Sequence, residues 1–133
     1  MESVVDNGGE GFLLCTPLAP LSGKNAEIFR RIALERTNQF GIRLAMTLNV
    51  ITERVLEAVV SIHFLRDSTE DRDRAHECVH HLTGAFQSLG FYPYRVNIDQ
   101  MVDRPRSAQL ADVIHKLKKA LDPNGIIAPG RYD

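Results

Sequence analysis

A tyrosine and an arginine stand next to each other at Tyr94 and Arg95, within the run FYPYRVNI of residues 91–98. An arginine stays protonated and donates hydrogen bonds from a rigid fork, and a tyrosine hydroxyl donates one more. If the strand is bulged or ends at this point, both side chains can reach one anionic oxygen. The plainer interpretation is a surface arginine beside a packed tyrosine, and the two residues alone leave both open.

A second candidate cation, Arg131, follows a run of turn-forming residues, DPNGIIAPG, at positions 122–130. The first residue of this run precedes a proline and is biased away from the helical region. Asn124-Gly125 is a turn pair, because glycine takes positive φ at little steric cost. We expect these turns to fix a backbone path, Ile126-Ile127 to anchor it in an apolar groove, and Arg131 to arrive as a fixed cation. The alternative is an ordinary helix end followed by a docked tail.

Other residue types that often do chemistry give weaker signals. His76 and His80 are four residues apart on a predicted helix and could share a metal, but they fall on its polar face without a third ligand. A solvated face is therefore favoured and no metal site is predicted. His63 lies on the mixed face of a predicted strand. Cys15 and Cys78 both lie in apolar runs, which favours small buried residues over a redox pair. The sequence contains neither a standard phosphate-binding glycine loop nor a nucleophile motif.

Composition limits the remaining possibilities. A chain of 133 residues with 44% hydrophobic and 25% charged residues is ordinary for one globular domain with a modest core. The net charge of -1 gives no indication of binding to nucleic acid or to an anionic membrane surface. No apolar run approaches the roughly 20 residues that a membrane span needs. The acidic N-terminus lacks a signal-peptide pattern, so a cytoplasmic location is the expectation.

Hydrophobic periodicity predicts the elements that must position these residues. Alternation over 43–51 and 55–65 predicts an antiparallel hairpin, with Leu56, Ala58, Val60, Ile62 and Phe64 forming its apolar face. Further strands are predicted at 11–16, ended by prolines, and at 91–98. Helical periodicity predicts helices at 24–39, 69–89 and 108–121, with N-caps at Ser22 and Ser107 and a helix start at residues 67–71 that carries acids in its first turn. The first six elements follow the split βαβ order of a ferredoxin-like α+β fold: a four-stranded antiparallel sheet with helices on one face, here followed by a C-terminal helix and docked tail.

Two of these segments carry a resemblance to a known family. Residues 90–97, GFYPYRVN, resemble the Gly-x-x-x-Tyr-Arg strand of FAD-linked oxidases of the vanillyl-alcohol oxidase and 4-cresol dehydrogenase type, and residues 122–131 resemble the terminal loop of that family. Residues 12–23 are similar to its entry strand into the substrate domain. The similarity covers about Gly9 to Arg131. It implies a substrate or cap domain, which the ferredoxin-like elements place at 10–106, and a C-terminal helix with a flavin-facing tail (107–133). Residues 1–9, which contain the turn-forming run Asn7-Gly8-Gly9, are predicted to be a flexible leader.

The resemblance also implies a chemistry for the three candidate residues. Tyr94 would bind a phenolic oxygen and help to ionise the phenol, and Arg95 would offset the developing negative charge and approach the flavin. Arg131 would stabilise the reduced flavin electrostatically. The implied cofactor is FAD, and the implied substrate is a hydroxylated, 4-alkylphenol-like aromatic compound that is oxidised by hydride transfer. Nearby cations lower a phenol pKa, so these roles are physically consistent.

The sequence departs from the family pattern in three ways. Many oxidases of this type attach the flavin through a histidine at a position close to Phe12, and residues 1–54 contain no histidine, so we expect no such link from this segment. The segment after Asn97 is shorter than in phenol oxidases, which leaves the form of the substrate wall open. No FAD-binding domain is recognisable, which predicts that the chain is a fragment or works beside a separate FAD-binding chain, and binds FAD weakly or not at all by itself. The alternative is a stand-alone ferredoxin-like module that dimerises through its sheet without catalysis, so homo-oligomerisation stays open.

Overall fold

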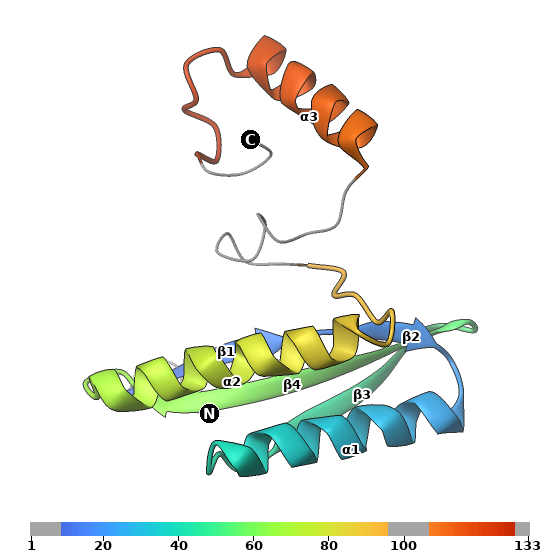
Figure 1. Cartoon of the computed structure of the whole chain (residues 1–133), viewed down its shortest axis with the longest axis vertical. Helices are drawn as coiled ribbons and strands as arrows, with labels where there is room; N and C mark the ends of the chain where they lie inside the picture. The colour runs from blue at the N-terminus through green and yellow to red at the C-terminus, as the bar shows by residue number, and fades with distance from the viewer. Residues whose placement is uncertain (1–8, 96–106, 130–133) are drawn as a thin grey trace, which may run out of the picture. The chain divides into compact units, whose positions relative to one another are not determined.

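A computed structural model describes residues 9–95 and 107–129 (Figure 1). The chain divides into two units, Met1–Tyr94 and Arg95–Asp133, each of which is compact by itself. Within the described ranges, no helix is long and apolar enough to cross a membrane.

The first unit is built around one long strand, β4 (Val55–Leu65), which pairs antiparallel with neighbours on both sides. On one side it pairs with β3 (Ala45–Thr52), and on the other with β1 (Glu10–Cys15) and β2 (Leu18–Pro20). The four strands form an antiparallel sheet, as the sequence predicted. The alternation of β4 sets which side chains face the core, because successive side chains of a strand point to opposite faces.

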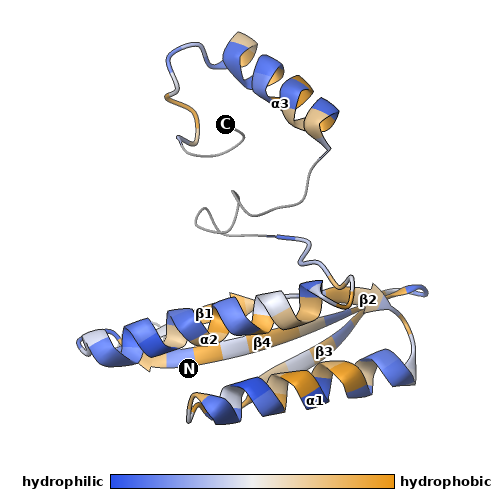
Figure 2. Cartoon of the chain, in the orientation of Figure 1, coloured by the Kyte–Doolittle hydropathy of each residue, from blue (hydrophilic) through white to orange (hydrophobic). Residues whose placement is uncertain are grey.

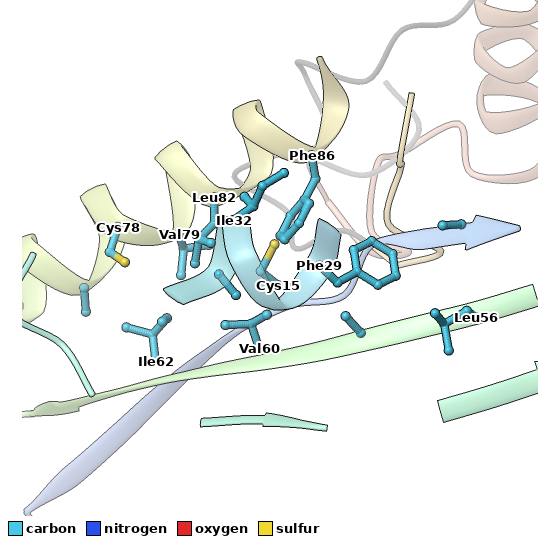
Figure 3. Close-up of a cluster of buried hydrophobic side chains, with 14 residues drawn as sticks. Cys15, Phe29, Ile32, Leu56, Val60, Ile62, Cys78, Val79, Leu82 and Phe86 are labelled. Atoms are coloured by element: carbon cyan, nitrogen blue, oxygen red, sulfur yellow. The ribbon is translucent and has the colours of Figure 1, made fainter. Parts of the chain in front are cut away.

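Two helices cover one face of this sheet, α1 (Gly23–Gln39) and α2 (Thr69–Gln87) (Figure 1). Ser22 and Ser68 cap them, each accepting a hydrogen bond from a backbone amide three residues later. Figure 3 shows the core between the helices and the sheet, where Phe29 of α1 and Phe86 of α2 meet edge to face with ring centroids 5.5 Å apart. The buried core side chains are Cys15, Ala19, Phe29, Ile32, Ala33, Leu56, Ala58, Val60, Ile62, Ala75, Cys78, Val79, Leu82 and Phe86.

The prediction that Pro17 and Pro20 end the first strand is confirmed, because β1 stops at Cys15 and β2 stops at Pro20. The sequence did not predict that pairing with β4 resumes between the two prolines, at Leu18. A proline removes one donor but keeps its carbonyl, and the Pro17 carbonyl accepts a hydrogen bond from the Ala58 amide at 3.1 Å. The register with β4 therefore continues across the interruption.

The strand predicted over 91–98 is not formed in its described part. Residues 91–95 contain one isolated bridge, between Pro93 and Pro17, and residues 96–98 lie outside the described ranges. One backbone hydrogen bond accompanies the bridge, from the Leu18 amide to the Tyr92 carbonyl at 3.0 Å. Two prolines that face each other offer no amide donors, so a regular ladder cannot extend through this pair.

The second unit contains α3 (Ala108–Leu121), which begins at the N-cap Ser107 as predicted. It has one apolar side, visible as orange bands on the ribbon in Figure 2. Within this unit the apolar side chains stay largely exposed to solvent: Leu110, Val113, Leu117 and Leu121. The helix is followed by a turn in which Gly125 has φ of +63°, as expected for a glycine in a tight turn.

Candidate functional site

The segment after α3 is held by the carboxylate of Asp122, the residue that directly follows the helix. Its two oxygens accept hydrogen bonds from the backbone amides of Ile126 at 2.8 Å and Ile127 at 2.9 Å. Lys118, one turn earlier in α3, donates to the same carboxylate at 2.5 Å and also to the Ile127 carbonyl. Asp122 is only 8% exposed. These contacts fold the chain back onto the end of the helix and fix the backbone at residues 122–127.

The electrostatics of this anchor favour the ionised carboxylate. The hydrogen bond from Lys118, and then those from the amides of Ile126 and Ile127, hold the pKa of Asp122 below its ordinary value. Hydrogen bonds donated to a carboxylate stabilise its charged form and so lower its pKa. The sequence indicated only that Asp122 stops the helix. The signal that was missed is the spacing, an aspartate four residues after a lysine and four residues before an isoleucine in a turn.

The prediction that Ile126 and Ile127 anchor the tail in an apolar groove stays a prediction. Within the second unit these side chains are 76% and 64% exposed, and the backbone that carries them is fixed by Asp122. Ile127 lines one wall of a mainly apolar hollow of about 310 Å³ at the end of α3, together with Ile114, Leu117, Leu121 and Ala128.

The three residues predicted to form the site fall in different places. Tyr94 is the last residue of the first unit, directly after the Pro17–Pro93 bridge, and its side chain is 54% exposed. Arg95 is exposed and is the first residue of the second unit. Arg131 lies outside the described residues. Their predicted convergence on one substrate therefore stays a prediction.

The face of the sheet opposite the helices carries a group of exposed apolar and aromatic side chains. Phe12 is 57% exposed and lies across from His63 in the register of β1 and β4, with ring centroids 6.4 Å apart. Leu14, two residues further along β1, is also exposed and lies opposite Ser61. We call this group, with Phe12, Leu14 and His63, the helix-free face. The mixed composition of this face was predicted from the alternation of residues 55–65.

β4 also carries a buried carboxylate, that of Glu57. Glu57 is on the side of β4 that faces away from the helices, yet it is only 5% exposed. Its register partner on β3, Asn49, donates a hydrogen bond to its Oε2 atom at 3.0 Å. A buried acid needs such partners, since an unpaired one is costly. The alternation of the sequence placed Glu57 on the mixed face but did not predict its burial, which depends on strand register.

Sequence comparison finds relatives that are much longer than this chain. No protein-family model matches it. It is 31% identical over 124 residues to 1'-carboxy-chondrochloren decarboxylase of Chondromyces crocatus, an alignment that covers 92% of this chain and 23% of that protein. It is 26% identical over 126 residues to the flavoprotein subunit of 4-cresol dehydrogenase [hydroxylating] of Pseudomonas putida, covering 93% and 24%. The chain thus spans about a quarter of the length of these curated relatives.

Solved structures share the fold. The 4-ethylphenol oxidase of Gulosibacter chungangensis, in its isoeugenol complex, superposes with a TM-score of 0.82 at 20% identity, over 96% of this chain and 25% of the oxidase. A substrate-bound p-cresol methylhydroxylase superposes with a TM-score of 0.80 at 25% identity, over 92% and 24%. The predicted α+β architecture is therefore confirmed, since nearly the whole chain superposes on a segment of each of these larger proteins.

Proposed function

Because this chain is related to the FAD-linked flavoproteins of the vanillyl-alcohol oxidase and 4-cresol dehydrogenase type, and resembles a C-terminal piece of them, we propose that it forms the substrate-binding half of such an enzyme. The reaction would be the oxidation of a hydroxylated, 4-alkylphenol-like aromatic compound. The FAD-binding half would be supplied by a longer polypeptide or by a separate chain.

One observation carries this proposal. More than nine-tenths of the chain aligns, in sequence and in fold, with the substrate-bound p-cresol methylhydroxylase, at 25% identity and a TM-score of 0.80. The Tyr94-Arg95 pair and the loop anchored by Asp122 are the segments that carried the sequence resemblance. A fold alone hosts many functions, so the two spaced motifs give the proposal its chemical content.

The residues present fit a flavin in one respect that can be checked on the structure. The helix-free face exposes Phe12 and Leu14 beside the His63 imidazole, which is a surface suited to an extended planar ring. None of these three side chains is a nucleophile in a motif, and Phe12 stands close to the position where many oxidases of this type link the flavin. When bound, the flavin would supply the acceptor for a hydride. We expect its contact with this chain to be noncovalent at Phe12.

The roles of the charged residues follow from ordinary electrostatics. The Tyr94 hydroxyl would donate a hydrogen bond to the phenolic oxygen, and the Arg95 guanidinium would favour the ionised form of the phenol. Arg131 would place a permanent positive charge near the cofactor, an arrangement typical of electrostatic stabilisation. Asp122 would act as a positioning residue, because it fixes the start of the loop that ends in Arg131.

The experiment compares FAD binding by the 133-residue chain with binding by a longer polypeptide that joins a flavin-binding domain of this protein type to its N-terminus. Flavin fluorescence measures binding, and stopped-flow absorbance measures flavin reduction by 4-cresol. We expect binding only in the longer polypeptide, and about 100-fold slower reduction after Arg95→Ala, the loss of one charge-assisted contact in the transition state.

Arg30 provides the matched control, since it is an exposed arginine on α1 whose partner is Glu27 at 2.8 Å. Arg30→Ala should leave flavin reduction unchanged. Unchanged reduction after Tyr94→Phe, Arg95→Ala and Arg131→Ala together would contradict the assigned roles. No flavin binding by either polypeptide would favour the alternative, a ferredoxin-like module that associates through its sheet without catalysis. A cytoplasmic location stays a prediction from the sequence.

A further inference from the structure

A hollow of about 350 Å³ lies between α1 and α2 in the first unit, and it belongs to neither the tail nor the helix-free face. Its volume is at the lower end of the roughly 300–1,000 Å³ that is typical of small-molecule sites. It is lined by Arg36 of α1 and by His80, His81, Gly84 and Ala85 of α2. Three of these five residues carry nitrogen donors that recognise anions, and none is acidic.

The guanidinium of Arg36 has more N–H donors than its neighbours in the described residues use. One of its terminal nitrogens donates to the Gln39 side chain at 3.0 Å. Within the described ranges, the one carboxylate within 4.0 Å is that of Glu35, at 3.9 Å, which is beyond hydrogen-bonding distance. The Arg36 side chain is about one-third exposed, so the guanidinium is partly withdrawn from water. An arginine in this setting favours a planar or tetrahedral oxyanion that accepts two hydrogen bonds.

The imidazole of His81 has its orientation set by packing. Its ring lies edge to face on Phe40, the C-cap residue of α1, with centroids 5.3 Å apart. Phe40 comes four residues after Arg36 at the end of α1, and His81 is on α2. Arg36 and His81 therefore line the hollow from two different helices. His80 is exposed on the neighbouring position of α2. Glu77 precedes both histidines by one turn but is not among the lining residues.

Gly84 has no packing reason to be glycine. It lies inside α2, where glycine costs roughly 1 kcal/mol relative to alanine, and a Cβ atom built there would meet no atom within 4 Å. Its φ is not positive, so the backbone does not require glycine either. The missing side chain instead leaves the floor of the hollow open, which lets a ligand approach the helix backbone.

We propose that this hollow binds the phosphate group of a small phosphorylated compound, with Arg36 and the two histidines as donors and Gly84 as the open floor. The proposal is independent of the flavin-related function. It makes the α1–α2 layer a second ligand site, separate from the sheet face that carries Phe12.

The test is an NMR titration of the 133-residue chain with inorganic phosphate, ribose 5-phosphate and ribose, following the amides of His81 and Gly84. We expect saturable shifts with the two phosphates, a Kd of about 1 mM, and no shift with ribose. Tighter binding of ribose 5-phosphate than of inorganic phosphate would support a phosphorylated compound as the ligand, and equal or tighter binding of inorganic phosphate would contradict it.

Two variants test whether the shifts come from binding in this hollow. Arg36→Gln should weaken binding about 10-fold or more, because one charge-assisted contact is lost. Gly84→Leu should abolish binding by filling the floor, while thermal unfolding shows that the fold is kept. Gly23→Leu is the matched control, since a Cβ atom built at Gly23 likewise meets no atom within 4 Å and this residue lies outside the hollow. Shifts that rise linearly with concentration, or that persist unchanged in Arg36→Gln and Gly84→Leu, would overturn the proposal.

Discussion

The Nζ atom of Lys118 lies 2.5 Å from Oδ2 of Asp122, and the same carboxylate accepts hydrogen bonds from the backbone amides of Ile126 and Ile127. The last turn of α3 and the loop that follows it therefore share one charged anchor. A second lysine–aspartate pair on the same helix, Asp112 with Lys116 at 2.7 Å, has the same four-residue spacing but is exposed on both sides. Comparing substitutions in the two pairs therefore distinguishes what the buried anchor does for the loop from what an exposed ion pair does.

The anchor should make the loop sensitive to acid. The pKa of Asp122 is lowered in the folded chain, first by Lys118, so the carboxylate stabilises the loop fully above its unfolded pKa of about 3.9. This stabilisation is lost as the pH falls through the lower folded value. NMR titration of the Ile126 and Ile127 amides should show a stable loop at pH 5–7 and loosening below about pH 4. Lys118→Met should raise the Asp122 pKa, and an unchanged value would contradict the role of Lys118.

Replacing the anchor should loosen the loop without unfolding the helix. Asp122→Ala removes the acceptor of two backbone amides, so amide hydrogen exchange at Ile126 and Ile127 should accelerate by roughly an order of magnitude. Asp112→Ala removes only an exposed ion pair and should leave those rates unchanged, since such pairs contribute little. Equal effects of the two substitutions would show that the loop is not held by Asp122.

Because Asn49 is paired with the buried Glu57, the effect of substituting Asn49 on the free energy of unfolding should depend on the residue at position 57. Asn49→Ala should lower the free energy of unfolding by about 1–3 kcal/mol, because it leaves a buried carboxylate without its donor. In a Glu57→Gln background the same change should cost less, since a neutral amide is cheaper to leave unpaired. Urea unfolding of the four proteins measures the difference. Additive losses of unfolding free energy would mean that the Asn49–Glu57 hydrogen bond does not stabilise the fold.

Close packing explains the glycine near the start of β1. A Cβ atom on Gly11 would lie 2.8 Å and 2.9 Å from two ring carbons of Phe64, its register partner on β4. Gly11→Ala should therefore lower the free energy of unfolding by about 1–3 kcal/mol, the usual cost of overpacking. Phe64→Leu should recover part of this loss in the double variant, as thermal unfolding would show. Gly23→Ala, with open space around its Cβ position, should be close to neutral.

The two cysteines should be slow to react. Burial raises the pKa of both Cys15 and Cys78 to about 11, so at pH 8 only about 0.1% of each would be thiolate. Labelling with a thiol reagent such as 5,5'-dithiobis(2-nitrobenzoic acid) should be much slower than in the unfolded chain and should speed up in urea. Fast labelling of the native chain, or formation of a disulfide between the two, would contradict the view that they are packing residues.

Local patterns were sufficient for most of the elements. The limits of β4 and α3 agree with the predicted ranges, because each has a strong period and a distinct N-cap or turn at its boundary. The two motifs that carry the family resemblance are also contiguous runs of residues. The order of the elements and the hairpin periodicity were enough to predict an α+β fold with an antiparallel sheet.

The sequence by itself thus determined most of the elements, the core face of β4 and the relationship to flavoproteins, since all of these depend on residues close together in the chain. Only the tertiary structure decided that β4 pairs on past Pro17 through a carbonyl, that Pro93 forms one bridge instead of a strand, and that Glu57 is buried against Asn49. It also decided that the Asp122 carboxylate holds the loop through the backbone amides of Ile126 and Ile127. These outcomes depend on register and on where the chain turns back, and neither is encoded in a local period.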